Sequence, residues 1–135
     1  MALVEEKVKE EDRELFNSFV PNRKANRHTK WVVDREKNIY FFWTGGEMRE
    51  SIDEFFMSWD NLKVYIYTYT EISSEKDEVY IRINRISIPK VLQGKDSEKN
   101  EIVNTIKEIL QILYNKSKVL FVSIAEPVVR KGENS

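Results

Sequence analysis

The stretch NLKVYIYTYTEIS (Asn61–Ser73) alternates almost without a break between two kinds of side chain. One set of alternate positions holds Val64, Ile66, Thr68 and Thr70, and the other holds Tyr65, Tyr67 and Tyr69. Because successive side chains of a β-strand point to opposite faces, this pattern predicts a strand. One face of the strand would be aliphatic, and the other would carry a row of tyrosines.

Behind the polar turn SSEKDE (Ser73–Glu78), a second stretch, VYIRINRISI (Val79–Ile88), alternates in the same way. Its expected inward positions are Val79, Ile81 and Ile83, and its expected outward positions are Tyr80, Arg82 and Asn84. Two alternating runs joined by a short polar segment predict a β-hairpin. We call its outer surface, which carries Tyr65, Tyr67, Tyr69, Tyr80 and Arg82, the tyrosine face.

The N-terminal third of the chain predicts a helix followed by a hairpin. Apolar residues between Val4 and Phe19 recur close to one helical face, and Pro21 ends that segment. WVVD (Trp31–Asp34) and NIYFFWT (Asn38–Thr44) then predict two strands joined by a polar turn. The second of these strands is apolar on both faces, which favours a central position in a sheet.

Two further helices and a last strand are expected. SIDEFFMSW (Ser51–Trp59) opens with Ser-x-x-Glu, the capping-box pattern, and continues with apolar residues at helical spacing. A helix is predicted to start at Asp96 or Ser97 and to run through Leu113 on a regular apolar stripe. KVLFVSI (Lys118–Ile124) predicts the last strand, and a polar tail follows from about residue 128.

These elements predict one α+β domain that spans residues 1–135. The expected order is α-ββ-α-ββ-α-β, with about five strands in one antiparallel or mixed sheet and helices mainly on one face. A chain of 135 residues with 41% hydrophobic content is large enough to bury its own core.

Composition excludes several chemistries. The chain has no cysteine, which removes disulfides, thiolate nucleophiles and cysteine-based metal centres. Its single histidine, His28, lies in a basic segment, so neither a nucleophilic triad nor an imidazole-based metal site is favoured. We therefore predict no catalytic residue, no metal and no cofactor. The N-terminus has no apolar targeting segment and no apolar run spans a bilayer, so a cytoplasmic protein without membrane contact is expected.

The tyrosine face is the leading candidate for a binding surface. Tyr and Arg are enriched at binding hot spots, because each combines a large contact area with a polar tip. The first hypothesis is a non-catalytic module that binds a protein partner, or a second copy of itself, through this face. In size and composition the chain is similar to small inhibitor, immunity and accessory proteins. The opposing interpretation is structural: the tyrosines stabilise the sheet, or the first helix covers them.

Two further functions stay open. Residues 21–37 hold six basic residues against two acidic ones. Single-stranded nucleic acid is the second hypothesis, with bases stacked on the same tyrosines and phosphates bound by Arg23, Lys24, Arg27 and Lys30. The third hypothesis is a small enzyme with an apolar ligand pocket. The aromatic residues that would line the pocket are Trp31, Phe42, Trp43, Phe55, Phe56 and Trp59. Packing in the core is the simpler explanation for these residues.

Overall fold

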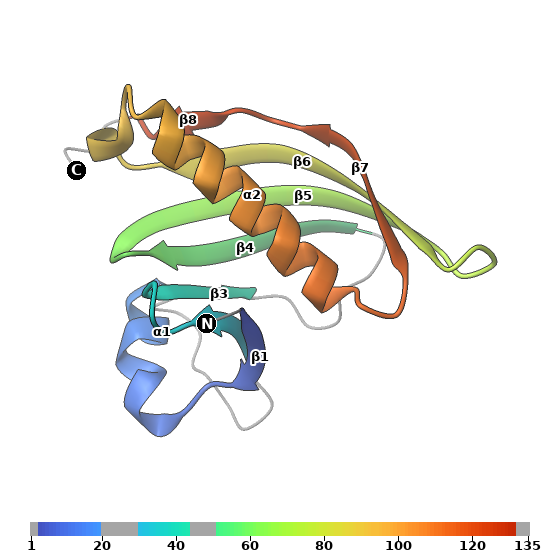
Figure 1. The fold of residues 1–135 in the computed structure, drawn as a ribbon, viewed down its shortest axis with the longest axis horizontal. Helices are drawn as coiled ribbons and strands as arrows, with labels where there is room; N and C mark the ends of the chain where they lie inside the picture. The colour runs from blue at the N-terminus through green and yellow to red at the C-terminus, as the bar shows by residue number, and fades with distance from the viewer. Residues whose placement is uncertain (1–2, 20–29, 44–50, 132–135) are drawn as a thin grey trace.

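The computed structural model describes residues 3–19, 30–43 and 51–131, which form one mixed sheet with a helix on each face (Figure 1). Within these ranges the strands are β1 (Val4–Lys7), β2 (Lys30–Asp34), β3 (Ile39–Trp43), β4 (Ser51–Trp59), β5 (Leu62–Ser73), β6 (Glu78–Ile88), β7 (Lys118–Ile124) and β8 (Pro127–Val129). The α-helices are α1 (Arg13–Phe19) and α2 (Asp96–Leu113), and the single 3-10 turns η1 (Glu10–Asp12) and η2 (Lys90–Leu92) precede them. The predicted α+β class is confirmed, but the sheet is larger than five strands and the order of elements differs.

The sheet is a meander that ends in a crossover. Strands β1 to β6 pair antiparallel, each with its neighbour in the chain. Helix α2 then crosses the sheet, so that β7 and β8 both return parallel to β6. This arrangement confirms the two predicted hairpins, helix α2 and the strand Lys118–Ile124. That strand is not the last one, because β8 follows it.

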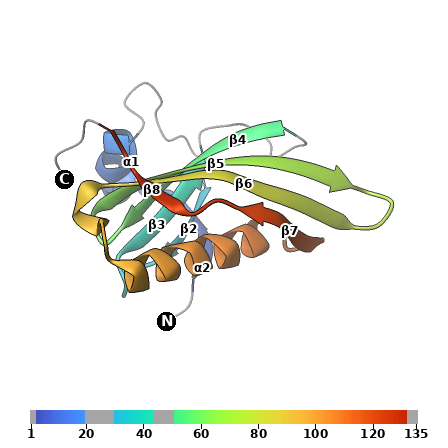
Figure 2. The same cartoon turned by 90° about the horizontal axis from the view of Figure 1, so that it is seen from above.

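The two helices cover opposite faces of the sheet, which corrects the prediction of helices mainly on one face (Figures 1 and 2). Helix α2 buries its apolar stripe against the side chains of β3 to β6, in a core that includes Phe41, Phe55 and Ile66. Helix α1 packs Phe16 on the other face, against a smaller core that contains Phe42. The reason is that β2, β3 and β4 are apolar on both faces, so both faces must be covered.

The segment Ser51–Trp59 is the central strand β4, and the prediction of a helix there is wrong. Phe55 and Met57 face the α2 core, while Phe56 packs in the α1 core. A strand buried on both faces reads as a continuous apolar run, and such a run also matches helical spacing. Asp60 and Asn61 then form a two-residue hairpin turn with φ of 46° and 70°, a conformation that Asp and Asn tolerate.

The predicted helix over Val4–Phe19 is also wrong in its first half, which forms β1 and pairs with β2. Arg35, in the turn after β2, hydrogen-bonds to the carboxylates of Glu6 and Asp12 (3.0 Å to Asp12), and both carboxylates raise the pKa of its guanidinium. These contacts fasten the N-terminal segment to the β2–β3 turn. At the other end of the chain, the predicted polar tail begins inside β8, which pairs with Ile86–Ile88 of β6.

Thr68 offers a test of the α2 core. Its side chain is fully buried, and its Oγ1 has no hydrogen-bond partner among the described residues. Burying an unpaired hydroxyl costs roughly 1–3 kcal/mol. We therefore expect Thr68→Val, which keeps the β-branched shape, to raise the free energy of unfolding by about 1 kcal/mol in a urea titration. A loss of stability would contradict this reading of the site.

Candidate functional site

The structure places the predicted binding residues on one face of β5 and β6. Val64, Ile66, Thr68 and Thr70 are buried toward α2, as the alternation predicts. Tyr65, Tyr67 and Tyr69 point to the opposite face and are half-buried, like Tyr80 of β6, and Arg82 is exposed. The tyrosine face is therefore a real surface of the sheet, on the side away from α2.

Cross-strand register shows which side chains meet on this face. Tyr69 lies directly opposite Arg82, and Tyr80 lies opposite Glu71. Paired positions of neighbouring strands share one face, so these side chains are in reach of one another. Tyr67 lies opposite Arg85 on one side and Glu54 of β4 on the other.

Arg85 was missed as a residue of the tyrosine face because strict alternation points it inward. A β-bulge shifts the register between Tyr67 and Thr68, so that Asn84 has no directly paired residue on β5. The sequence carries a signal for this shift. The apolar residues of β6 are odd-numbered up to Ile83 and then even-numbered at Ile86 and Ile88.

Tyr65 differs from the other tyrosines, because it belongs to the edge of the α1 core. Its ring meets Phe56 edge-to-face at 5.2 Å, and the Arg130 guanidinium lies 4.8 Å from its centroid. Arg130 Nη1 donates to the carbonyls of Lys63 (2.7 Å) and Ser87 (2.9 Å). Helix α1 therefore covers the Tyr65 end of the face only.

Beyond Tyr65, the face contains a pocket of about 220 Å³. Its lining residues are Tyr69, Glu71, Tyr80, Arg82 and Val122. Val122, on β7, is 48% exposed and is an apolar residue that the sequence pattern does not assign to the site. Within the described part of the chain, no hydrogen bond or ion pair engages the side chains of Tyr69, Tyr80 or Arg82.

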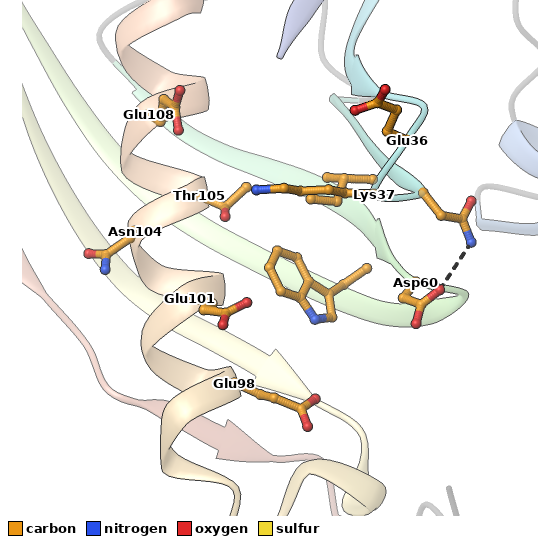
Figure 3. A pocket seen from close by; sticks show the side chains of 11 residues that line it. Glu36, Lys37, Asp60, Glu98, Glu101, Asn104, Thr105 and Glu108 are labelled. Carbon is orange, nitrogen blue, oxygen red and sulfur yellow. Dashed lines mark hydrogen bonds between the residues drawn. The ribbon is translucent and has the colours of Figure 1, made fainter. Parts of the chain in front are cut away.

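A second concavity, of about 730 Å³, lies on the other face between α2 and the turns that end β2 and β4 (Figure 3). Trp59 and Ile39 supply its apolar surface, and Asn38 Nδ2 donates to Asp60 Oδ1 (3.4 Å) and Asn61 Oδ1 (3.1 Å) at its rim. Its charged lining residues are Glu36, Asp60, Glu98, Glu101 and Glu108, with Lys37 as the one basic residue in the described lining. This groove has an acidic rim, and its chemistry favours cationic over anionic groups.

The residues of the other two hypotheses lie elsewhere. Arg23, Lys24, Arg27 and His28 fall outside the described residues. Lys30 begins β2, which β3 and β4 separate from β5. Of the aromatic residues suggested for an apolar pocket, Trp31, Phe42, Phe55 and Phe56 are buried in the two cores, and Trp59 lines the acidic groove.

Within the described ranges, no group of three or more His, Cys, Asp or Glu side chains is arranged to hold a metal ion. No helix in the described ranges has both the length and the apolar character that crossing a lipid bilayer requires. Comparison of the chain with family models, with curated proteins and with solved structures found no match. Function must therefore be inferred from the surfaces of the molecule itself.

Proposed function

We propose that this chain is a non-catalytic protein-binding module that docks a partner on the tyrosine face. The observation that carries the proposal is the pocket formed by Tyr69, Tyr80, Arg82 and their neighbours, whose polar groups have no partner within the described residues. Half-buried rings on a paired sheet are held in place in the free protein, so a partner loses little side-chain entropy to engage them.

Local charge favours a protein over a nucleic acid as the partner. Around the pocket, the tyrosine face carries Arg82 and Arg85 together with Glu54 and Glu71, so the formal charges of these four residues balance, while Lys63 and Arg130 lie at the Tyr65 end. A surface that binds a phosphate backbone needs an excess of basic groups. Mixed charges around aromatic anchors are instead typical of protein interfaces, where they determine orientation and specificity.

The test uses the Tyr69→Ala/Arg82→Ala double variant, because these two residues lie directly opposite each other and both line the pocket. The matched control is Gln111→Ala/Lys116→Ala, at two exposed positions near the end of α2. Each protein is used to capture partners from a lysate of the source cells, and affinity for each captured protein is then measured by titration. Circular dichroism checks that the variants fold.

A partner of the tyrosine face is expected to bind wild type and control equally and to lose at least about 30-fold in affinity with the double variant, since hot-spot residues contribute about 2 kcal/mol or more. Equal binding to all three proteins would contradict the proposal. Titration with labelled single-stranded oligonucleotides at two salt concentrations tests the second hypothesis. Binding that requires Tyr69 and Arg82 and falls steeply with salt would favour nucleic acid instead.

A further inference from the structure

The acidic groove beside α2 lies on the opposite face of the sheet from the tyrosine face, and it has an apolar floor. Trp59 of β4 and Ile39 of β3 supply this floor, and α2 forms one wall (Figure 3). The volume of about 730 Å³ falls within the range that small-molecule sites occupy, roughly 300–1,000 Å³. The shape of the groove therefore suits a small ligand, and its charged side chains decide the chemistry of that ligand.

Three carboxylates of the groove, Glu98, Glu101 and Glu108, follow one side of α2 (Figure 3). Ten residues of α-helix rise about 15 Å, so these groups form a row along the helix and do not surround one point. Within the described residues, none of the three takes part in a hydrogen bond or an ion pair. The row therefore suits a ligand whose positive charges are spaced along a chain.

Lys37 shows which kind of cation the groove accommodates. It lies in the turn after β2, and its side chain points across the groove toward Thr105 of α2 (Figure 3). An alkylammonium group of the protein thus already lies in the groove, yet it forms no ion pair with any described residue. One ammonium against five carboxylates leaves the described lining with an excess of negative charge. That excess attracts further cations from solution.

We propose that the groove binds a linear aliphatic polyamine, with its ammonium groups at the carboxylates and its methylene chain on Trp59 and Ile39. The ligand lies along α2, so that successive charges meet Glu98, Glu101 and Glu108. An ammonium over the ring of Trp59 also gains from the negative face of the indole. This site is independent of the proposed protein-binding function, because none of its lining residues lines the pocket of the tyrosine face.

The size of the site favours a small polycation over a basic segment of a protein. A stable protein interface covers roughly 800 Å² on each partner, whereas the groove is one concavity of small-molecule size. A divalent metal ion is a poorer match, because it needs several oxygen ligands around one point. Within the described residues, no group of carboxylates is arranged in that way.

Calorimetric titration of the purified chain with spermidine, a linear triamine, tests the site at low and at physiological salt. Wild type is expected to bind one molecule per chain, with an affinity that falls as salt rises. Glu101→Gln/Glu108→Gln should lower the affinity about ten-fold, since two carboxylates of the row become neutral. Both residues are exposed, so the fold should tolerate the change. The matched control is Glu75→Gln/Glu126→Gln, which removes the same charge at exposed positions outside the groove and should bind like wild type.

Lys37→Met supplies a measurement of the opposite sign. It removes the ammonium that competes for the carboxylates and keeps an unbranched side chain. The affinity for spermidine should therefore rise about three-fold. A general loss of stability or solubility in the variant would not raise an affinity, so this result would be specific to the groove. Unchanged or weaker binding by Lys37→Met would contradict the placement of the ligand.

Several other outcomes would overturn the proposal. These are no spermidine binding at low salt, equal losses in the groove variant and its control, and displacement of spermidine by Mg²⁺ at matched ionic strength. A tetralysine peptide that binds through Glu101 and Glu108 where spermidine does not would assign the groove to a protein partner. Tyr69→Ala/Arg82→Ala should bind spermidine like wild type, so failure of this site and failure of the tyrosine face are distinguishable.

Discussion

Replacing Met57 with alanine is expected to lower the free energy of unfolding by about 2–5 kcal/mol. Met57 is fully buried in the α2 core, on the face of β4 that also carries Phe55. Removing its side chain leaves a cavity between the central strand and the helix. This large loss of stability is expected only if β4 is a strand, because Met57 is then buried in the α2 core. In a helix over Ser51–Trp59, Met57 would lie opposite the apolar side formed by Phe55 and Phe56, and its truncation would cost little.

Urea unfolding followed by tryptophan fluorescence measures the effect, with the midpoint shifted and the slope unchanged. Glu54→Ala is the matched control, because Glu54 is exposed on the same strand and would be exposed in a helix as well. Its substitution should change the free energy of unfolding by no more than about 0.5 kcal/mol. If Met57→Ala behaved like this control, the strand assignment and its two-sided burial would be wrong.

Local patterns in the sequence are sufficient for the elements whose two faces differ. The β5–β6 hairpin alternates Val, Ile or Thr with Tyr, and α2 has apolar residues on one side only, so their spacing identifies both. The same alternation correctly separates Val64 and Ile66 from Tyr67 and Tyr69. Alternation alone therefore predicts that the five residues of the tyrosine face share one surface.

Elements that depend on distant partners are not predictable in this way. β4 pairs with β3 and β5 at its two edges, and the α1 and α2 cores bury apolar residues on both of its faces. Its apolar residues therefore form a nearly continuous run, whose spacing does not distinguish a strand from a helix. β1 is a strand only because Val4–Lys7 pairs with β2, which lies more than twenty residues further along the chain. Val122 joins Tyr69 and Arg82 through the crossover of α2, and no spacing within the sequence brings them together.

Net charge illustrates the same limit for function. The net charge of the chain is −1, which gives no indication of a charged site. Nevertheless, all but one of the charged residues that line the groove beside Trp59 are carboxylates. Glu98, Glu101 and Glu108 follow one side of α2, while Glu36 and Asp60 reach the groove from two turns (Figure 3). Around the pocket of the tyrosine face, by contrast, Arg82 and Arg85 lie among Glu54 and Glu71, and each of these four residues is opposite a tyrosine on a neighbouring strand. Only the fold shows that the groove is acidic and that the surroundings of the pocket carry charges of both signs.

Replacing Phe16 with alanine is expected to detach α1 from the sheet. Phe16 is 3% exposed, and its ring lies 4.9 Å from that of Phe42 in the smaller core. A seven-residue helix is not stable alone, so α1 depends on this contact. Losing a buried phenylalanine costs about 3–5 kcal/mol, which exceeds what the remaining contacts of so short a segment are expected to supply.

Hydrogen exchange should therefore become faster in α1 of Phe16→Ala, while the amides of α2 and β5 keep their protection. The hydrophobic dye ANS should bind the variant, because Phe42 and Phe56 lose their cover. Asn17→Ala is the control, since Asn17 is exposed on the same helix. Unchanged exchange in α1 with no dye binding would mean that Phe16 does not hold the helix. If α1 does detach, the apolar surface beneath it joins the tyrosine face, so the same variant also shows how far α1 limits the area open to a partner.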